Sequence, residues 1–209
     1  MLGPRRSVVP AAAVWALVAF ASGSVPWAVW LTRLITRADV RDVGDSNPGG
    51  ANAWKVGGCR LGALVLVLDF LKGALPVYLA VRLGGVEGWG LTLVGIAPVL
   101  GHAFSPLLRF RGGKALATTA GIWTPPTSGQ ALLPIFFCLG VGHAVQKVHV
   151  WSVAAAAAGM LVFLLVRYPE PPLLTLWAAN LGVIVFKHKV ELQRGLEPRR
   201  WLLRALRRA

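Results

Sequence analysis

Two adjacent glycines lie among basic residues in the segment 109–114, between two apolar stretches. Adjacent glycines allow a tight turn in which successive backbone N–H groups converge on an anion, and Arg111 and Lys114 would neutralise its charge. A helix beginning near Ala115 would add the positive end of its dipole. The segment is therefore a candidate phosphate site, although its spacing is not that of the nucleotide-binding P-loop. A basic turn at a membrane surface explains the same residues equally well.

Two further turns carry residues of the same chemical kind. The segment 43–52 combines glycines with Ser46, Asn47 and Asn52, and Lys55 follows it. Glycine permits close backbone approach, and the polar side chains can donate hydrogen bonds to an anion. A solvated loop has a similar composition. In the segment 187–191, His188 could bind an anion or exchange a proton near neutral pH, or simply lie at the membrane interface.

A carboxylate and an ammonium group interrupt the apolar stretch 62–81. Asp69 and Lys72 are three residues apart, so on a helix they share a face and can form an ion pair. Charged side chains at membrane depth are costly and are commonly functional. Two interpretations remain at this point: a structural ion pair that fixes helix packing, and a direct role in a site.

The elements that position these residues must be membrane helices. Of the 209 residues, 56% are hydrophobic and 14% are charged, whereas globular proteins carry about 25% charged residues. The mean hydropathy is +0.62. We therefore expect an all-α, polytopic transmembrane protein with one domain, 1–209. The net charge of +14 is then explained by the positive-inside rule rather than by a nucleic-acid partner. The widely separated Cys59 and Cys138 support neither a disulfide nor a metal site.

The hydropathy pattern predicts seven spans, including a short hairpin made by the fourth and fifth. They are expected near 11–32, 62–81, 89–108, 115–127, 130–146, 149–167 and 172–186. The N-terminal apolar run imitates a signal peptide, but an uncleaved first span is the better interpretation because apolar character resumes after it. The segment 199–208 is amphipathic and is predicted to be an interfacial helix.

The positions of the cations predict how the chain is oriented in the membrane. Sixteen of the 22 cations fall in the two connections after the first and third spans and in the C-terminal tail, which we therefore place in the cytoplasm. An even number of spans must then separate the segment 109–114 from the tail, which is why 115–146 is predicted to be a hairpin. The N-terminus would lie outside, with Arg5 and Arg6 as exceptions to the rule.

Five ordered segments, which together span nearly the whole chain, resemble the bacterial acyl-phosphate:glycerol-3-phosphate acyltransferase family. Residues 23–26 are similar to its Gly-Ser-Ile-Pro, and 41–52 to its Arg-x-Val-Gly-Ser-Gly-Asn-x-Gly-Ala-Thr-Asn loop. Residues 68–73 match its Leu-Asp-Phe-Leu-Lys-Gly. Residues 101–118 resemble its Gly-His-x-Phe-Pro through Lys-Gly-Gly-Lys-Gly-Val-Ala-Thr, and 188–194 resemble its His-Arg-x-Asn-Ile-x-Arg.

The resemblance implies transfer of a fatty acyl group from acyl phosphate to the sn-1 hydroxyl of glycerol 3-phosphate, which gives lysophosphatidic acid. It implies a bacterial inner-membrane enzyme without a cofactor or metal, whose partners are acyl phosphate, glycerol 3-phosphate and membrane lipid. The catalytic residues would be His102, Lys114, His188 and Asn47. The phosphate-binding residues would be Arg111, Gly112, Gly113, Lys55, Asn52, Gly49, Thr118 and Ser46.

The chain departs from the family pattern at positions that bear on the chemistry. Asp45 stands where the family has Ser, Ser46 and Ala115 stand where it has Gly, and Glu191 stands where it has Asn. Two extra carboxylates beside a phosphate site would repel the substrate unless cations or protonation offset them. One alternative is therefore a catalytically inactive member that binds lipid or a partner. A transporter of phosphorylated anions is a further alternative, which the missing inverted repeat disfavours.

Overall fold

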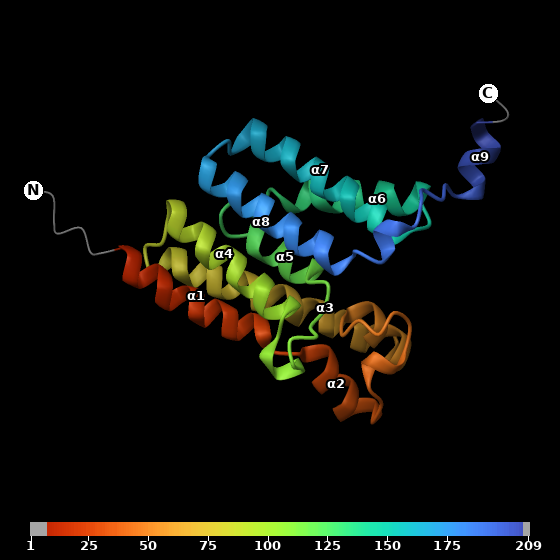
Figure 1. Ribbon diagram of the computed structural model, residues 1–209, viewed down its shortest axis with the longest axis horizontal. Coiled ribbons are helices and arrows are strands. Elements are labelled where there is room, and N and C mark those ends of the chain that lie inside the picture. The colour runs from red at the N-terminus through yellow and green to blue at the C-terminus, as the bar shows by residue number, and fades with distance from the viewer. Residues whose placement is uncertain (1–7, 207–209) are drawn as a thin grey trace, which may run out of the picture.

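The protein is a bundle of helices in a computed structural model that describes residues 8–206, and within them it contains no β-strand (Figure 1). The predicted all-α membrane fold is confirmed. The helices are α1 Val8–Ser24, α2 Trp27–Thr36, α3 Gly50–Arg82, α4 Gly88–Ala103, α5 Leu116–Trp123, α6 Leu132–Val145, α7 His149–Arg167, α8 Pro171–Lys187 and α9 Arg200–Leu206. Three single 3-10 turns connect them: η1 Val40–Asp42, η2 Pro106–Leu108 and η3 Glu191–Gln193.

Four stretches are long and apolar enough to cross a membrane: Ala11–Thr36, Gly50–Arg82, Gly88–Leu108 and His149–Arg167. Helices α6 and α8 are shorter apolar helices. Helix α5 has eight residues, which gives a length of about 12 Å, less than half of a hydrocarbon core of about 30 Å. Seven spans therefore stay a prediction.

The first predicted span, 11–32, lies within the apolar stretch Ala11–Thr36, but this stretch is made of two helices and not of one. Helix α1 ends at Ser24, and α2 begins at Trp27 at an angle to it (Figure 1). The break falls at Val25 and Pro26. Proline lacks a backbone N–H and disfavours helical geometry in the residue before it, so the chain changes direction there.

The second predicted span, 62–81, is the C-terminal part of a longer helix. Helix α3 begins at Gly50 and is kinked where Gly57 and Gly58 leave helical geometry, Gly58 with a φ of +78°. Only glycine adopts that conformation readily, so the kink depends on it. The short part of α3 before the kink therefore carries Asn52 and Lys55 on a helix rather than on a loop.

The break predicted inside the 115–146 hairpin is present, and hydrogen bonds within this segment pair its backbone groups. The Thr127 hydroxyl donates to the Trp123 carbonyl (2.6 Å) and accepts from the Ala131 amide (3.2 Å). The Gly129 amide donates to the Thr124 carbonyl (2.8 Å). Thr127 is fully buried. Protein therefore supplies the hydrogen bonds that lipid would not.

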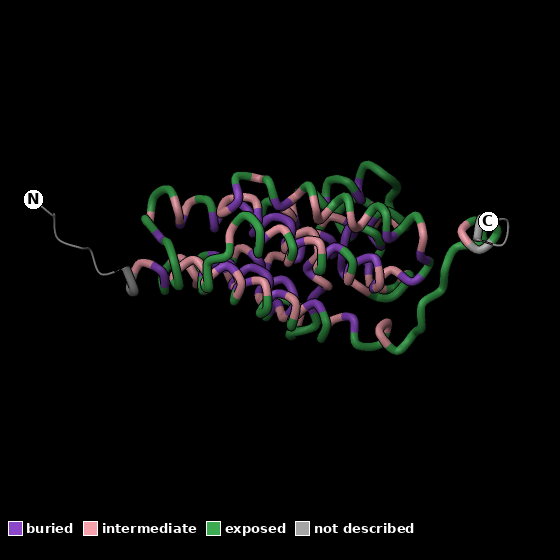
Figure 2. Tube along the Cα trace, turned by 90° about the horizontal axis from the view of Figure 1, so that it is seen from above, coloured by how far each residue is buried: buried purple, intermediate pink, exposed green. Residues whose placement is uncertain are grey.

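The helices pack closely through small residues, while their outer faces expose large apolar side chains. Gly101 of α4 lies against the α1 backbone at Phe20, and Gly121 of α5 lies against the α3 backbone at Phe70, where a Cβ would not fit. Buried residues follow the inside of the bundle along its length (Figure 2). Exposed Leu, Val and Phe side chains on the outside fit a lipid environment.

The C-terminal segment is tied to the α6–α7 connection. Gln146 and Pro198 form an isolated antiparallel bridge, and the Gln146 side chain accepts from the amides of Lys147 (2.7 Å) and Glu197 (2.9 Å). Helix α9 follows, which confirms a helix in the described part of the predicted interfacial segment. Arg5, Arg6, Arg207 and Arg208 lie outside the described residues.

Candidate functional site

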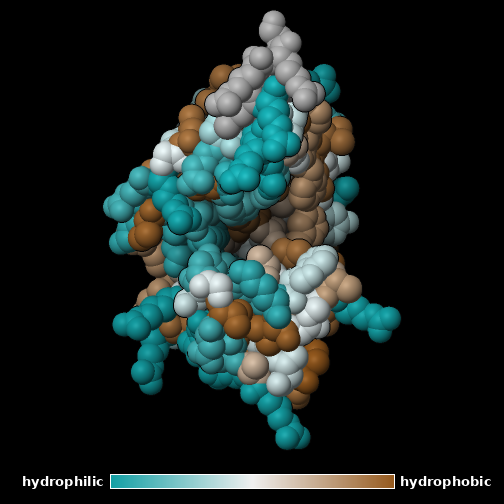
Figure 3. All heavy atoms as spheres, turned by 90° about the vertical axis from the view of Figure 1, so that its right-hand side faces the viewer, coloured by the Kyte–Doolittle hydropathy of each residue, from teal (hydrophilic) through white to brown (hydrophobic). Residues whose placement is uncertain are grey.

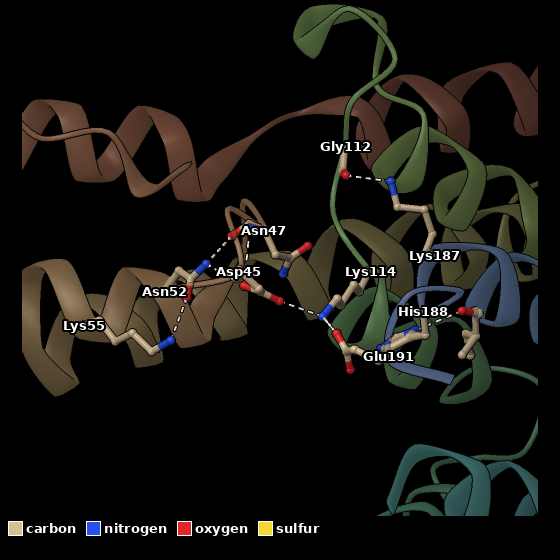
Figure 4. Close-up of polar contacts among 10 residues, drawn as sticks. Asp45, Asn47, Asn52, Lys55, Gly112, Lys114, Lys187, His188 and Glu191 are labelled. Atoms are coloured by element: carbon tan, nitrogen blue, oxygen red, sulfur yellow. Dashed lines mark hydrogen bonds and ion pairs between the residues drawn. The ribbon is translucent and has the colours of Figure 1, made fainter. Parts of the chain in front are cut away.

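Three segments far apart in the sequence meet at Lys114. Its ammonium nitrogen lies 2.6 Å from Oδ2 of Asp45, in the loop before α3, and pairs with Oε1 of Glu191, in η3 after α8. Figure 4 shows Lys114 between these two carboxylates. Hydrophilic side chains gather on this end of the molecule, and its surface is hollowed near the middle (Figure 3). The three turns singled out in the sequence therefore form one site.

The loop before α3 is organised around Asp45. Its Oδ1 accepts from the side chain of Asn52 (2.8 Å) and from the amide of Asn47 (3.3 Å). Asn52 also donates to the Asn47 carbonyl (3.0 Å), and its own oxygen accepts from Lys55 (3.1 Å). Gly49 caps α3 and donates its amide to the Asn47 carbonyl (2.9 Å). The predicted polar residues of this loop thus lie together, in contact with a carboxylate.

The glycine turn packs tightly against the end of α4. The Gly113 amide donates to the His102 carbonyl (3.1 Å), and the Gly112 carbonyl accepts from Lys187 (2.7 Å). Lys187 also donates to the Ala103 carbonyl (3.0 Å), so one ammonium group joins the turn, α4 and α8. A Cβ at Gly112 would overlap the His102 carbonyl, and one at Gly113 would overlap the His102 ring. These glycines are therefore required for packing, and the Gly113 amide is engaged within the chain.

Two residues of the site hold left-handed backbone conformations that favour glycine. Ala115, directly after Lys114, has a φ of +59°, and Ser46 has a φ of +57°. Both are positions where the family pattern quoted above has glycine. A residue with a Cβ is strained in this conformation, whereas glycine is not. Both turns therefore keep the backbone conformation that suits glycine, although neither residue is a glycine.

A buried polar cluster lies behind the turn and contains two predicted site residues. His102 Nδ1 lies 3.4 Å from the Thr118 hydroxyl and 3.8 Å from an Asp69 oxygen. The Thr118 hydroxyl donates to the Asp69 carbonyl (2.9 Å). Asp69 and Lys72 form a buried ion pair (2.8 Å), and Lys72 donates to the Val25 carbonyl (2.8 Å). The pair therefore joins α3 to the break after α1, as the structural interpretation predicts.

His188 is almost completely buried beside the site. Its Nδ1 lies 2.9 Å from the Ile184 carbonyl, which can only accept, so Nδ1 carries the proton. The neutral ring then presents Nε2 as an acceptor, and Nε2 has no hydrogen-bond partner among the described residues. Burial lowers the pKa of His188 and keeps the ring neutral. The ring of His149 packs nearby, and that histidine contacts His143 (2.9 Å).

The carboxylate pairs set the ionisation of the site. Partial burial by itself would raise the pKa of Asp45, but the hydrogen bonds from Lys114 and Asn52 outweigh it and lower the pKa to about 2. Partial burial likewise opposes the charge of Lys114, whereas the two carboxylates raise its pKa above the ordinary value. Asp45 is therefore ionised and Lys114 protonated at neutral pH, and the ammonium charge is already compensated.

Two predicted phosphate-binding residues make no side-chain contact with Lys114. Ser46 is exposed beside Asp45, and Arg111 lines a separate cavity with Arg109. Lys187 was missed as a site residue. Its only sequence signal was a cation at the end of an apolar stretch, which the positive-inside rule explains by itself. Asn180 was also missed: it is buried in α8 and donates to Thr119 (3.2 Å).

The fold and the site define a polytopic helical membrane protein with a cationic turn, amide side chains and an unprotonated histidine nitrogen at one end. A family model described as glycerol-3-phosphate acyltransferase matches residues 13–197. The chain belongs to the glycerol-3-phosphate acyltransferase family.

Individual relatives agree with this assignment. The glycerol-3-phosphate acyltransferase of Desulfovibrio desulfuricans is 35% identical over 200 residues, which cover 90% of this chain and 84% of that protein. The enzyme of the same name from Aquifex aeolicus is 32% identical over 88% of this chain and 94% of its own length. Crystal structures of PlsY (YgiH), an integral membrane glycerol 3-phosphate acyltransferase, are also similar. Its glycerol 3-phosphate form has a TM-score of 0.75 and 30% identity, covering 88% of this chain and 90% of that one.

Proposed function

We propose that this protein transfers a fatty acyl group from acyl phosphate to the sn-1 hydroxyl of glycerol 3-phosphate and so forms lysophosphatidic acid. The observation that carries the proposal is the convergence of three polar turns on Lys114 in a chain of this family. The relatives named above are glycerol-3-phosphate acyltransferases, and one PlsY structure is the lysophosphatidic acid form. The acyl phosphate donor is inferred from the family resemblance described above.

Acyl phosphate suits a site of this kind because it is a mixed anhydride. The substrate hydroxyl oxygen attacks the acyl carbonyl carbon, the bond from that carbon to the phosphate oxygen breaks, and inorganic phosphate leaves. No covalent enzyme intermediate is needed, so the protein has mainly to hold two anions and align the hydroxyl. Cations and amide donors do this, and within residues 8–206 no cluster of metal-ligating side chains accompanies them.

Lys114 is the proposed phosphate-binding cation. It lies at the start of α5, on a turn fixed by Lys187 and His102, so its position does not depend on substrate. Asn47 in the facing loop and Asn52 in the first turn of α3 would supply amide donors once the bound phosphate displaces Asp45. Lys55, exposed on α3 and in contact with Asn52, would bind the second anion.

His188 would accept the proton of the attacking hydroxyl. A buried, neutral ring with a free Nε2 is a proton acceptor, and this role fits the lowered pKa better than binding an anion does. His102 would act through the backbone, because its carbonyl holds the Gly113 amide and its ring contacts Thr118. It is a positioning residue in this scheme.

An inactive family member is a second candidate, and one observation favours it. Asp45 and Glu191 already compensate Lys114, so the chain's own carboxylates stand where a substrate phosphate would bind. A protein of this kind would keep the fold and bind lipid or a partner without turnover. An assay of acyl transfer distinguishes the two candidates, because only the enzyme would form product.

The single domain 1–209 would lie in a bacterial inner membrane, with the Lys114 site and the C-terminus in the cytoplasm. The distribution of cations supports this orientation, because sixteen of the 22 cations fall in the connections after the first and third predicted spans and in the C-terminal tail. Soluble glycerol 3-phosphate would then reach the site from the cytoplasm. The acyl chain would lie among the apolar helices.

The test is acyl transfer by the purified protein in lipid, with labelled glycerol 3-phosphate and either palmitoyl phosphate or palmitoyl coenzyme A. We expect labelled lysophosphatidic acid with palmitoyl phosphate only. Lys114→Ala should abolish it, whereas Lys147→Ala, at an exposed lysine with no side-chain partner among the described residues, should not. Absence of product from folded protein would refute the enzyme proposal, and product with the coenzyme A thioester alone would refute the donor.

A further inference from the structure

A cavity of about 520 Å³ lies beside α2, apart from the residues that hold Lys114. Four arginines line it: Arg33 at the end of α2, Arg41 in η1, and Arg109 and Arg111 in the turn after η2. The remaining lining residues are apolar and come from α2 and η2. The acyltransferase proposal assigns no role to this cavity.

The positive charge of the cavity is only partly compensated. Arg33 and Arg41 share one carboxylate, Asp39, with contacts of 2.6 Å and 2.7 Å to its Oδ2. The side chains of Arg109 and Arg111 make no hydrogen bond or ion pair with any other residue in the part of the chain that the structure describes. The charge of Asp42 also acts on Arg41, so four guanidinium groups face two carboxylates and a net charge of about +2 remains. Guanidinium groups are well suited to phosphate because they offer paired donors in a plane.

The rim of the cavity is apolar and open. The side chain of Trp30 is 48% exposed and that of Leu107 is 59% exposed, and both line the cavity. Leu34 and Phe110, next to lining residues in the sequence, are also exposed, at 79% and 64%. Tryptophan, leucine and arginine side by side are typical of the membrane–water interface. A ligand of this cavity would therefore meet arginines at one end and lipid at the other.

We infer that this cavity binds a membrane phospholipid with a phosphomonoester headgroup, that is, a phosphatidate. Its phosphate would lie among the four arginines and its acyl chains would pass Trp30 and Leu107 into the bilayer. A phosphomonoester carries a charge of about −1.5 to −2 near neutral pH, which matches the remaining charge of about +2 better than a phosphodiester with a single charge does. A zwitterionic headgroup would bring its own cation to the arginines and is disfavoured.

The inference is tested by titrating the purified full-length protein with dioctanoyl phosphatidate and measuring binding by native mass spectrometry and thermal shift. The titration uses the Lys114→Ala variant, so that binding at the Lys114 site does not contribute. The double variant Arg33→Gln/Arg109→Gln should bind about tenfold more weakly or worse, because two charge-assisted contacts are lost. Arg60→Gln/Arg82→Gln removes the same charge from two exposed arginines outside the cavity and should bind like the parent.

A second variant keeps the test independent of arginine replacement. Leu107→Glu places a carboxylate at the exposed rim and should also abolish phosphatidate binding while leaving the melting temperature unchanged. Equal binding by the parent and the Arg33/Arg109 double variant would overturn the inference. Dioctanoyl phosphatidylcholine binding as tightly as phosphatidate would overturn it too. So would displacement by inorganic phosphate at an equal concentration, since that would show a site for free anions.

Discussion

Neutralising Asp45 and Glu191 tests whether these carboxylates compete with the substrate for Lys114. The changes Asp45→Asn and Glu191→Gln keep the size of each side chain and remove its charge. In the present structure two of the three N–H donors of Lys114 already contact carboxylates, so a substrate phosphate competes with them for the ammonium group. Removing either carboxylate should therefore lower the KM for glycerol 3-phosphate.

The exposure of the two side chains sets the size of the effect. Asp45 is 49% exposed, and an ion pair so exposed contributes about 0.2–1 kcal/mol, so Asp45→Asn should lower KM by up to about fivefold. Glu191 is 23% exposed, and a hydrogen bond between charged groups there contributes about 1.5 kcal/mol, so Glu191→Gln should lower KM about tenfold. The double variant should lower KM by less than the product of the two single-variant factors, because both side chains contact one ammonium group.

The assay is the initial rate of acyl transfer as a function of glycerol 3-phosphate at saturating palmitoyl phosphate. The turnover number should stay constant, because a ground-state competitor changes substrate binding and not the transition state relative to bound substrate. The decrease in KM should be smaller at high salt, where exposed charges are screened. Glu197→Gln, at an exposed carboxylate of the same end of the molecule, should leave KM unchanged.

One result would refute this reasoning outright. If either variant raises KM or lowers the turnover number, the carboxylates hold Lys114 in its binding position and do not compete with the substrate. A parent without activity whose double variant transfers acyl groups would instead identify the inactive-member candidate. It would also identify the two residues responsible for the loss.

Three further predictions concern the support of the site. Ala115→Gly and Ser46→Gly should each stabilise the protein by up to about 1 kcal/mol, seen as a higher melting temperature, because both residues hold a positive φ; a lower melting temperature would contradict this. Lys187→Met should lower the free energy of unfolding by about 1–3 kcal/mol, because two backbone carbonyls lose their hydrogen-bond donor. The control is Lys189→Met, because among the described residues the Lys189 ammonium contacts only an aromatic ring. The His188 ring, whose pKa is lowered in the folded state, binds its proton more readily when the chain is unfolded. Stability should therefore fall as pH drops below about 6.5 and should be independent of this group above it, and His188→Gln should flatten the profile.

Composition predicted the membrane helices, and three polar turns together with the family resemblance predicted the site. A long apolar stretch bounded by cations is most simply explained as a membrane-spanning helix. A helix satisfies its own backbone hydrogen bonds, which lipid cannot do for an irregular segment. The Asp69–Lys72 pair was predictable from helical periodicity alone, and the structure joins the two at 2.8 Å. The break at Pro26 was overlooked because the residues on both sides of it are apolar, although a proline within a predicted helix is a local signal.

Tertiary contacts were harder to predict. The sequence indicated that Asp45 and Glu191 would repel a phosphate, but not that both would pair with the same lysine, because they are 146 residues apart and lie on different elements. The role of Lys187 depends on two carbonyls that the fold brings to it from α4 and the glycine turn. Backbone acceptors carry no side-chain signature, so such contacts leave no motif in the sequence.

The two carboxylates also change how the glycine turn should be understood. An empty cluster of cations repels itself, and Lys114 lies close enough to Lys187 for their charges to interact. Asp45 and Glu191 offset that repulsion when no substrate is bound, and they join the loop before α3 to η3 through one ammonium group. Glu191 contributes a charge where the family pattern has a neutral amide, so this link is stronger than Asn would allow. Under the proposed function, a substrate phosphate would therefore replace the two carboxylates at Lys114, and the ease of that exchange would decide whether the site turns over.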